Sequence, residues 1–189
     1  MQYSLPIDAV MFAREFIAGV TQMVKSQEAL VIAGEYTRWT YAVKRWLAQS
    51  AKENDCYAIF TESGKSNEFM LDLVWWKQGR PSSALLACES EWGNSRHPEG
   101  NPARVAEDFD KLLSFKAPFK LMIFEADADS ALEGDTIQSL NRYLVDYADH
   151  RIGEQYLVVN FCKEPKAWLC PIGLSGHGDG LELLPLGSL

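Results

Sequence analysis

The stretch FMLDLVWWKQGRPSSALLACESEW, residues 69–92, decides the fold. It predicts two β-strands, about Phe69–Trp76 and about Ala84–Glu91, which the turn KQGRPSS joins. The first strand is apolar on both faces apart from one aspartate, and the second is apolar until it ends in two glutamates. Runs that are apolar on both faces are typical of a sheet that helices cover on both sides. The stretch therefore predicts a buried central sheet that carries three carboxyl groups.

These three acidic residues are Asp72, Glu89 and Glu91. Because side chains alternate along a strand, Glu89 and Glu91 should point to the same side, together with Leu85 and Ala87. A side shared with apolar residues is expected to be buried, and buried carboxylates are costly unless a cation or hydrogen bonds compensate them. A hard divalent cation such as Mg²⁺ commonly occupies a carboxylate cluster. We therefore expect a Mg²⁺ site here, with Mn²⁺ as an alternative ion.

The totals restrict the class of protein. A chain of 189 residues with 47% hydrophobic content can bury one sizeable core, so a single domain over residues 1–189 is expected. The chain has no apolar run of membrane-spanning length, no signal-peptide pattern at its start and no CxxC pair, which favours a cytoplasmic protein without a membrane partner. A net charge of −8 argues against holding nucleic acid by bulk electrostatics. It does not exclude an enzyme with a local basic track.

The elements around the opening stretch predict an α/β protein. Two helices and a short strand should precede it, and alternating helices and strands should follow it. A strand, a helix and a strand in succession imply parallel pairing, so the sheet should be mixed and the fold a three-layer sandwich. Its core should span about residues 28–172, and the Gly-rich tail 173–189 should loop over the surface. The predicted elements are helices over Leu5–Lys25, within Glu28–Asn54, from Asn101-Pro102 onward and after a cap at either Ser130 or Asp135, and strands over Cys56–Phe60, Phe119–Phe124, Gln155–Cys162 and Ala167–Ile172.

One stripe of the second helix is basic. Arg38, Arg45 and Lys52 recur at helical spacing on the same side. A solvated face with intrahelical charge pairs is the plain interpretation, and a track that contacts phosphates is the functional one.

The element order and the positions of the acids resemble the PD-(D/E)XK nuclease superfamily, which has the restriction-endonuclease-like fold. The matching residues are Asp72 on the second core strand and Glu89 on the third, within a region of about residues 28–125. The family lysine normally follows that glutamate by two residues, where this chain has Glu91. In some members the lysine lies on the following helix, and here that helix carries EDFDKLL with Lys111. A glutamate on the helix before the strands is a further family feature, for which Glu35 is the candidate.

The resemblance implies a Mg²⁺-dependent endonuclease that hydrolyses phosphodiester bonds of DNA. Asp72, Glu89 and Glu35 would bind the metal, while Glu91 would bind it or orient the attacking water. Lys111 would stabilise the negative charge of the hydroxide or phosphate, as a preorganised cation can. For Glu35 the alternative is a carboxylate at a helix start, which the helix dipole favours. A protein partner for target recognition and a homodimer both stay open.

Each of the other site residues also has a structural interpretation. Asp72 could be a buried carboxylate paired with an arginine, because an unpaired buried charge is costly. Glu89 and Glu91 could end a strand that reaches solvent, since acidic residues are mostly exposed. Lys111 could form a surface ion pair with Asp108.

Two other functions compete with DNA hydrolysis. The first is a nuclease-fold protein that no longer cuts and serves as a binding or regulatory module, which the missing second-strand lysine and the acidic composition favour. The second is a carboxylate metal enzyme on a small phosphate substrate, which would suit the negative charge.

Overall fold

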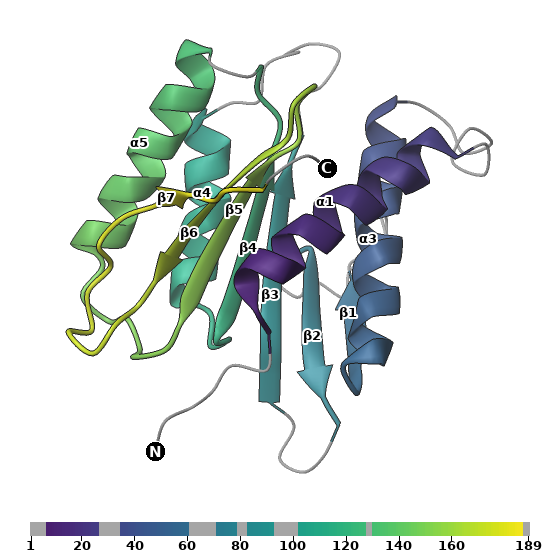
Figure 1. Ribbon diagram of the computed structural model, residues 1–189. Coiled ribbons are helices and arrows are strands. Elements are labelled where there is room, and N and C mark those ends of the chain that lie inside the picture. The colour runs from purple at the N-terminus through teal and green to yellow at the C-terminus, as the bar shows by residue number, and fades with distance from the viewer. Residues whose placement is uncertain are drawn as a thin grey trace.

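The computed structural model describes residues 7–26, 35–60, 71–78, 83–92, 102–127 and 130–186, with the side chains of residues 35–38 outside that description. A seven-stranded mixed sheet lies between two layers of helices (Figure 1). The expected α/β three-layer sandwich is thus confirmed at the level of its layers. No helix of the described residues is long and apolar enough to cross a membrane.

The strands follow one another across the sheet in chain order. Strands β1 to β3 form an antiparallel meander, β3, β4 and β5 are parallel, and β6 and β7 continue antiparallel. The parallel pairing of β3 with β4, which the intervening helix predicted, is confirmed. The elements are α1 (Ala9–Lys25), α3 (Glu35–Glu53), β1 (Cys56–Phe60), β2 (Leu73–Lys77), β3 (Ser83–Glu91), α4 (Pro102–Ser114), β4 (Phe119–Phe124), α5 (Ala131–Asp146), β5 (Gln155–Asn160), β6 (Lys166–Pro171) and β7 (Glu182–Leu183).

Several boundaries differ from the sequence expectation. Strand β2 begins at Leu73, so Asp72 lies in a bend just before the strand and not within it. Helix α1 begins later than predicted because Asp8 caps it, and its carboxylate accepts the N–H groups of Val10 and Met11, each at 3.0 Å. The Gly-rich tail is not only a surface loop, because β7 within it pairs with β6.

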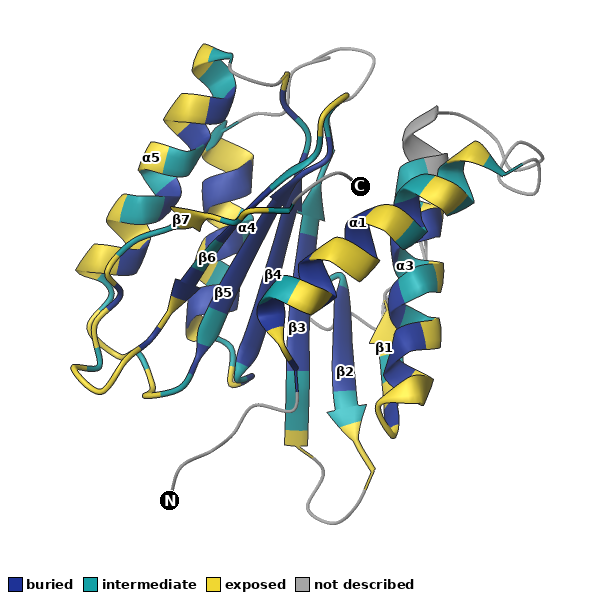
Figure 2. Cartoon of the chain, in the orientation of Figure 1, coloured by how far each residue is buried: buried dark blue, intermediate teal, exposed yellow. Residues whose placement is uncertain are grey.

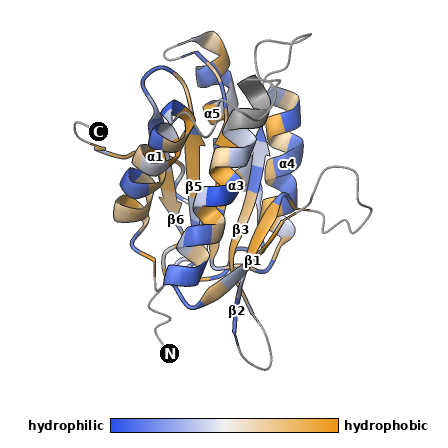
Figure 3. Cartoon of the chain, turned by 90° about the vertical axis from the view of Figure 1, so that its right-hand side faces the viewer, coloured by the Kyte–Doolittle hydropathy of each residue, from blue (hydrophilic) through white to orange (hydrophobic). Residues whose placement is uncertain are grey.

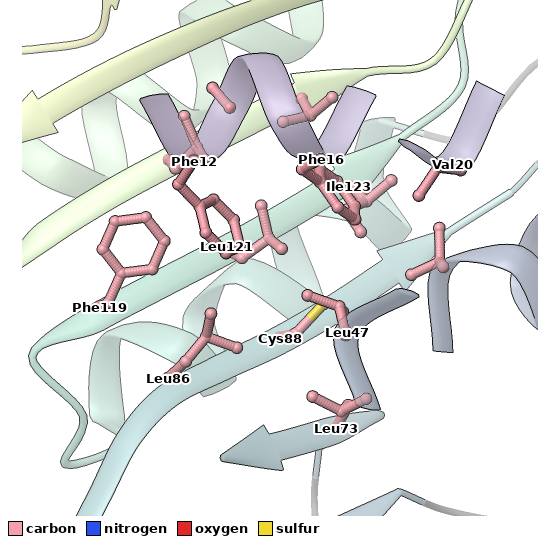
Figure 4. Packing of buried hydrophobic residues seen from close by; sticks show 14 of the residues in the cluster. Phe12, Phe16, Val20, Leu47, Leu73, Leu86, Cys88, Phe119, Leu121 and Ile123 are labelled. Carbon is pink, nitrogen blue, oxygen red and sulfur yellow. The ribbon is translucent and has the colours of Figure 1, made fainter. Parts of the chain in front are cut away.

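Helices α1 and α3 cover one face of the sheet. The side chains that α1 buries recur every three or four residues, as an amphipathic helix requires: Ala9, Phe12, Ala13, Phe16, Ile17 and Val20. Figure 4 shows Phe12 beside Phe119 and Leu121 of β4 and Phe16 beside Ile123, with Leu47 of α3 near Cys88 of β3. This face is closed by a cluster of aromatic and aliphatic side chains.

Helices α4 and α5 cover the opposite face. Pro102 is the first residue of α4, as predicted for a proline whose missing N–H costs nothing at that position. Ser130 caps α5, and its hydroxyl accepts the N–H of Glu133 at 3.1 Å. The central strands are buried along their length, while the helices alternate buried and exposed residues (Figure 2). The same alternation appears as hydrophobic and hydrophilic stretches on α3 and α4 in Figure 3.

A bulge interrupts the pairing of β2 with β3. Trp75 pairs with Leu86 but Trp76 pairs with Ala84, which leaves Leu85 as the extra residue. Leu85 therefore packs against the cluster beneath α1 and α3, whereas Ala87 belongs to the cluster beneath α4 and α5. The expectation that these two residues share a face was wrong, because the bulge resets the alternation between them.

Candidate active site beside strand β3

The acidic residues of the opening stretch gather near the end of β3, on the side that α4 covers. Leu73 pairs with Cys88, so Asp72 lies next to Glu89 across the strand pair. The backbone N–H of Asp72 donates to Glu89 Oε2 at 3.4 Å. Because α4 returns over the same face after β3, its polar side chains reach these carboxylates.

The carboxylate of Asp72 is held by Ser90. Its Oδ2 accepts the backbone N–H of Ser90 at 3.0 Å and the Ser90 hydroxyl at 2.7 Å. These two hydrogen bonds compensate the half-buried carboxylate, in place of the arginine that the structural interpretation expected. The arrangement also fixes the bend before β2 against the end of β3.

Glu89 is the most constrained of the acids. The residue is only 4% exposed, and its Oε1 has no hydrogen-bond partner among the residues that the structure describes. The Lys111 ammonium lies 3.6 Å from that oxygen. Burial raises the pKa of Glu89 to about 8, the charges of Asp72 and Asp108 add to the rise, and Lys111 opposes it. The structural interpretation, in which Glu89 lies at a strand end that reaches solvent, is therefore wrong for this residue.

Lys111 lies between two carboxylates. Its ammonium donates a hydrogen bond to Asp108 Oδ1 at 2.6 Å and forms the longer ion pair with Glu89. The hydrogen bond to Asp108 is the main cause of a raised Lys111 pKa, so this side chain carries its charge firmly. Lys111 therefore forms the expected ion pair with Asp108 and also lies beside Glu89.

Glu91 pairs with a residue that the sequence analysis did not single out. Its Oε1 lies 3.2 Å from Arg104 Nη1, and the two side chains are 14% and 58% exposed. Burial raises the pKa of Glu91 although Arg104 lowers it, and the charges of Asp108 and Asp72 contribute to the rise. Glu91 thus belongs to the same electrostatic cluster as the other acids.

A sequence signal for Arg104 was present. Arg104 and Lys111 are seven residues apart, which is about two helical turns and places both on one side of α4. The acids at positions 89 and 91 lie on one side of a neighbouring strand for the analogous reason. Two basic residues on a helix that returns over two acidic ones predict the pairing seen here. For Ser90, a residue between two glutamates, no such signal existed.

The other sequence candidates lie on α3. Glu35 is the first residue of α3, and its side chain lies outside the described residues, as does that of Arg38. Arg45 and Lys52 are exposed on α3. Within the ranges that the structure describes, no three His, Cys, Asp or Glu side chains form a group that could hold a metal ion.

This arrangement can perform two kinds of chemistry. A buried carboxyl group with a pKa near 8 carries a proton at neutral pH and can give it to a neighbour. The same group, once ionised, would stabilise a cation close to Oε1, because that oxygen has no hydrogen bond to lose. Lys111 adds a fixed positive charge that can stabilise an anion beside the carboxylates.

Fold and site together define an α/β sandwich with an acidic, lysine-containing cluster at the end of a central strand. In comparisons with known proteins no family model matches the chain, and neither a curated protein nor a solved structure matches it.

Proposed function

We propose that the chain is a Mg²⁺-dependent phosphodiester hydrolase that acts on DNA, with a restriction-endonuclease-like fold. The observation that carries this proposal is the contact between Lys111 of α4 and Glu89 of β3, at 3.6 Å. The resemblance requires a lysine near the second metal-binding carboxylate, and a lysine displaced to the following helix is the variant that the sequence predicted. The chain order of helix, three-stranded meander, helix and parallel strand supports the same fold.

The residues present fit a divalent cation at one point in particular. Among the described residues Glu89 Oε1 is buried without a hydrogen bond, and burial together with the charges of Asp72 and Asp108 raises the pKa of its carboxyl group although Lys111 lies 3.6 Å away. Asp72 and Glu89 would hold Mg²⁺, with Glu35 as a further ligand. The ion, when bound, would make a water more acidic and stabilise the charge on the leaving oxygen.

The chain's own residues supply the remaining functions. Lys111 would stabilise the charge that develops on the phosphate, since its ammonium is held in place by Asp108. Ser90 would keep Asp72 oriented through its two hydrogen bonds. Glu91 would orient the attacking water from the exposed side of the cluster.

The test is to incubate the purified protein with plasmid and linear DNA in Mg²⁺ and in Mn²⁺. We expect the wild type to cut and both Asp72→Asn and Glu89→Gln to lose cutting. Lys111→Met should lower the rate about 10²-fold or more, as the loss of one electrostatic stabiliser does, with Mg²⁺ affinity retained in calorimetry. Lys116→Met, an exposed lysine just after α4, is the matched control and should cut normally. Normal cutting by Lys111→Met would return Lys111 to a structural role.

The second candidate function is a binding or regulatory module on the same fold. It is favoured by the commitment of Asp72 Oδ2 to Ser90 and of Glu91 to Arg104, which leaves fewer carboxylate oxygens for a metal. DNA that stays intact with every variant while the protein still binds it would support this candidate. Turnover of a nucleotide or phosphomonoester, with DNA untouched, would instead support a small phosphate substrate.

A further inference from the structure

The acidic cluster beside β3 is bordered by two basic side chains from one side of α4. Lys111 contacts Glu89 and Arg104 contacts Glu91, so each of these two acids of β3 faces one cation of α4. Lys111 is about one third exposed, whereas Arg104 is 58% exposed. Arg104 is therefore the cation of this cluster that is most open to a large ligand.

Glu91, the partner of Arg104, is the more buried member of the ion pair. Glu91 is only 14% exposed, whereas Arg104, which lies 3.2 Å from it, is 58% exposed. Solvent screens the exposed guanidinium group, so exchanging Glu91 for another anion there costs less than it would in a fully buried pair. Two oxygens of a phosphate can accept two parallel hydrogen bonds from a guanidinium group. The contact of Arg104 with Glu91 involves only one of its nitrogens.

We propose that Arg104 contacts a phosphate of bound DNA and that its ion pair with Glu91 opens when it does. This inference rests on the proposed function, because it takes DNA as the ligand of the β3 cluster. The opening has a consequence for Glu91, whose carboxylate is released toward the acids that it neighbours. Arg104 thereby couples the arrival of the DNA backbone to the arrangement of the site.

Charge determines the order in which ligands bind. The cluster holds four carboxyl groups, Asp72, Glu89, Glu91 and Asp108, against the cations Arg104 and Lys111, which leaves a formal charge of −2 when all are ionised. A phosphate is repelled by this charge, whereas a divalent cation brings the cluster to neutrality. DNA binding at this cluster should therefore depend on Mg²⁺.

The experiment measures binding, not cutting. A labelled duplex with a phosphorothioate backbone is titrated with protein by fluorescence anisotropy, with Mg²⁺ or with EDTA. Wild type should bind tightly only with Mg²⁺. Arg104→Gln should weaken that binding about tenfold, the cost of one charge-assisted contact, and should lower the salt dependence by about one unit of slope. Arg104→Lys should fall between, since it keeps the charge but not the planar fork.

Glu91→Gln separates ligand exchange from a purely structural ion pair. If Arg104 leaves Glu91 for a phosphate, Glu91→Gln removes the competing anion and tightens duplex binding, opposite in sign to Arg104→Gln. If the pair only holds α4 to β3, both variants lose the same contact and shift binding in the same direction, which would overturn the inference. Arg142→Gln removes an exposed arginine of α5 and is the matched control, expected to bind as the wild type does.

The failure of this inference differs from the failure of the proposed function. If the two variants shift duplex affinity in opposite directions but the wild type cuts DNA with neither Mg²⁺ nor Mn²⁺, Arg104 is still a DNA contact and the proposed hydrolysis is wrong. If Arg104→Gln cuts DNA and binds the duplex normally, Arg104 is not a DNA contact and the proposed hydrolysis still stands. Absence of Mg²⁺-dependent duplex binding by the wild type would overturn the inference outright. Circular dichroism of each variant confirms that it is folded.

Discussion

Glu89 is buried more deeply than an ionised carboxylate tolerates without compensation. Its surroundings provide one long ion pair with Lys111 and one weak hydrogen bond from the Asp72 backbone, against the charges of two neighbouring acids. A residue placed like this lowers stability whenever it ionises, and such residues are commonly found where function requires them. The cost should be visible as a dependence of stability on pH.

The sign of that dependence follows from the raised pKa. Glu89 titrates near pH 8 in the folded chain and near its ordinary value of about 4.3 when unfolded. Below both values the group is protonated in both states, and no penalty exists. As the pH rises toward 8 the unfolded chain loses this proton first, so the contribution of Glu89 to stability falls.

We expect Glu89→Gln to remove this penalty. At pH 8.5 in EDTA the variant should be more stable than the wild type by about 2 kcal/mol or more, and the gain should shrink toward pH 5. Urea unfolding at the two pH values measures it. Glu107→Gln, an exposed position on α4, is the control and should show no such pH dependence. An equal effect of Glu89→Gln at both pH values would mean that the carboxyl group is not buried in the way described.

At the residue scale the sequence predicted the positions of the acids better than their partners. Alternation along a strand placed Glu89 and Glu91 on one side, and the family resemblance placed Lys111 near these acids. Hydrogen bonds such as those from Ser90 to Asp72 depend on the bend before β2, which no period in the sequence reveals. The neighbours of a side chain at a strand end are set by tertiary geometry, so they could not be read from spacing.

At the scale of elements, the packing of α1 against α3 depends on a glycine. A Cβ added at Gly19 of α1 would overlap Nε1 and Cδ1 of Trp46 on α3. The Trp46 ring cannot easily move, because it packs edge-on against Phe12 and Phe16 with centroids 5.5 and 5.2 Å apart. Absence of a side chain at position 19 therefore lets α1 and α3 approach each other.

This contact predicts opposite effects for two helix glycines. Gly19→Ala should destabilise the chain by about 1–2 kcal/mol, because overpacking outweighs the better helix propensity of alanine. Gly134→Ala on α5, where nothing lies within 4 Å of the added Cβ, should instead stabilise it by about 0.5–1 kcal/mol. Thermal unfolding of both variants tests the pair. A stabilising Gly19→Ala would show that α3 can shift without cost.

Apolar segments bounded by turn or polar residues were predicted well, whereas features that depend on the pairing of strands were not. Cys56–Phe60 and Phe119–Phe124 were predicted as strands with the bounds that the structure has. The two-residue strand β7 has no period to detect, and the bulge at Leu85 is a property of strand pairing that one strand alone does not encode.

At the scale of the whole molecule, a second buried charge cluster lies on the same face as the acids but toward the other end of the parallel strands. Lys120 of β4 is 1% exposed and donates to the Tyr156 hydroxyl at 2.8 Å and the Leu113 carbonyl at 3.2 Å. Its ammonium also lies 3.2 Å from Glu154 Oε2. The apolar run FKLMIF predicts a buried strand, but the partner of the lysine within it depends on the tertiary fold and cannot be predicted from this run.

The two clusters differ in how well their charges are compensated. Glu154 accepts hydrogen bonds from the Tyr156 hydroxyl at 3.0 Å and the Arg151 backbone N–H at 3.3 Å, besides its ion pair with Lys120. Burial lowers the pKa of Lys120, and Glu154 opposes that shift. The cluster around Glu154 should therefore stabilise the fold as a unit, whereas the cluster around Glu89 should weaken it in the absence of a cation.

Removing one partner of this second cluster should expose its energetics. Lys120→Met leaves the Glu154 carboxylate buried without its cation and should destabilise the chain by about 3 kcal/mol. Glu154→Gln should also destabilise it, while the double variant should lose clearly less than the sum, because neither charge is then left alone. Urea unfolding at pH 7 gives the full cycle, with exposed Lys163→Met as the control expected within about 0.5 kcal/mol of the wild type. Additive losses in the double variant would mean that Lys120 and Glu154 are stabilised independently, by Tyr156 and the backbone, and that the ion pair does not hold β4 to the segment before β5.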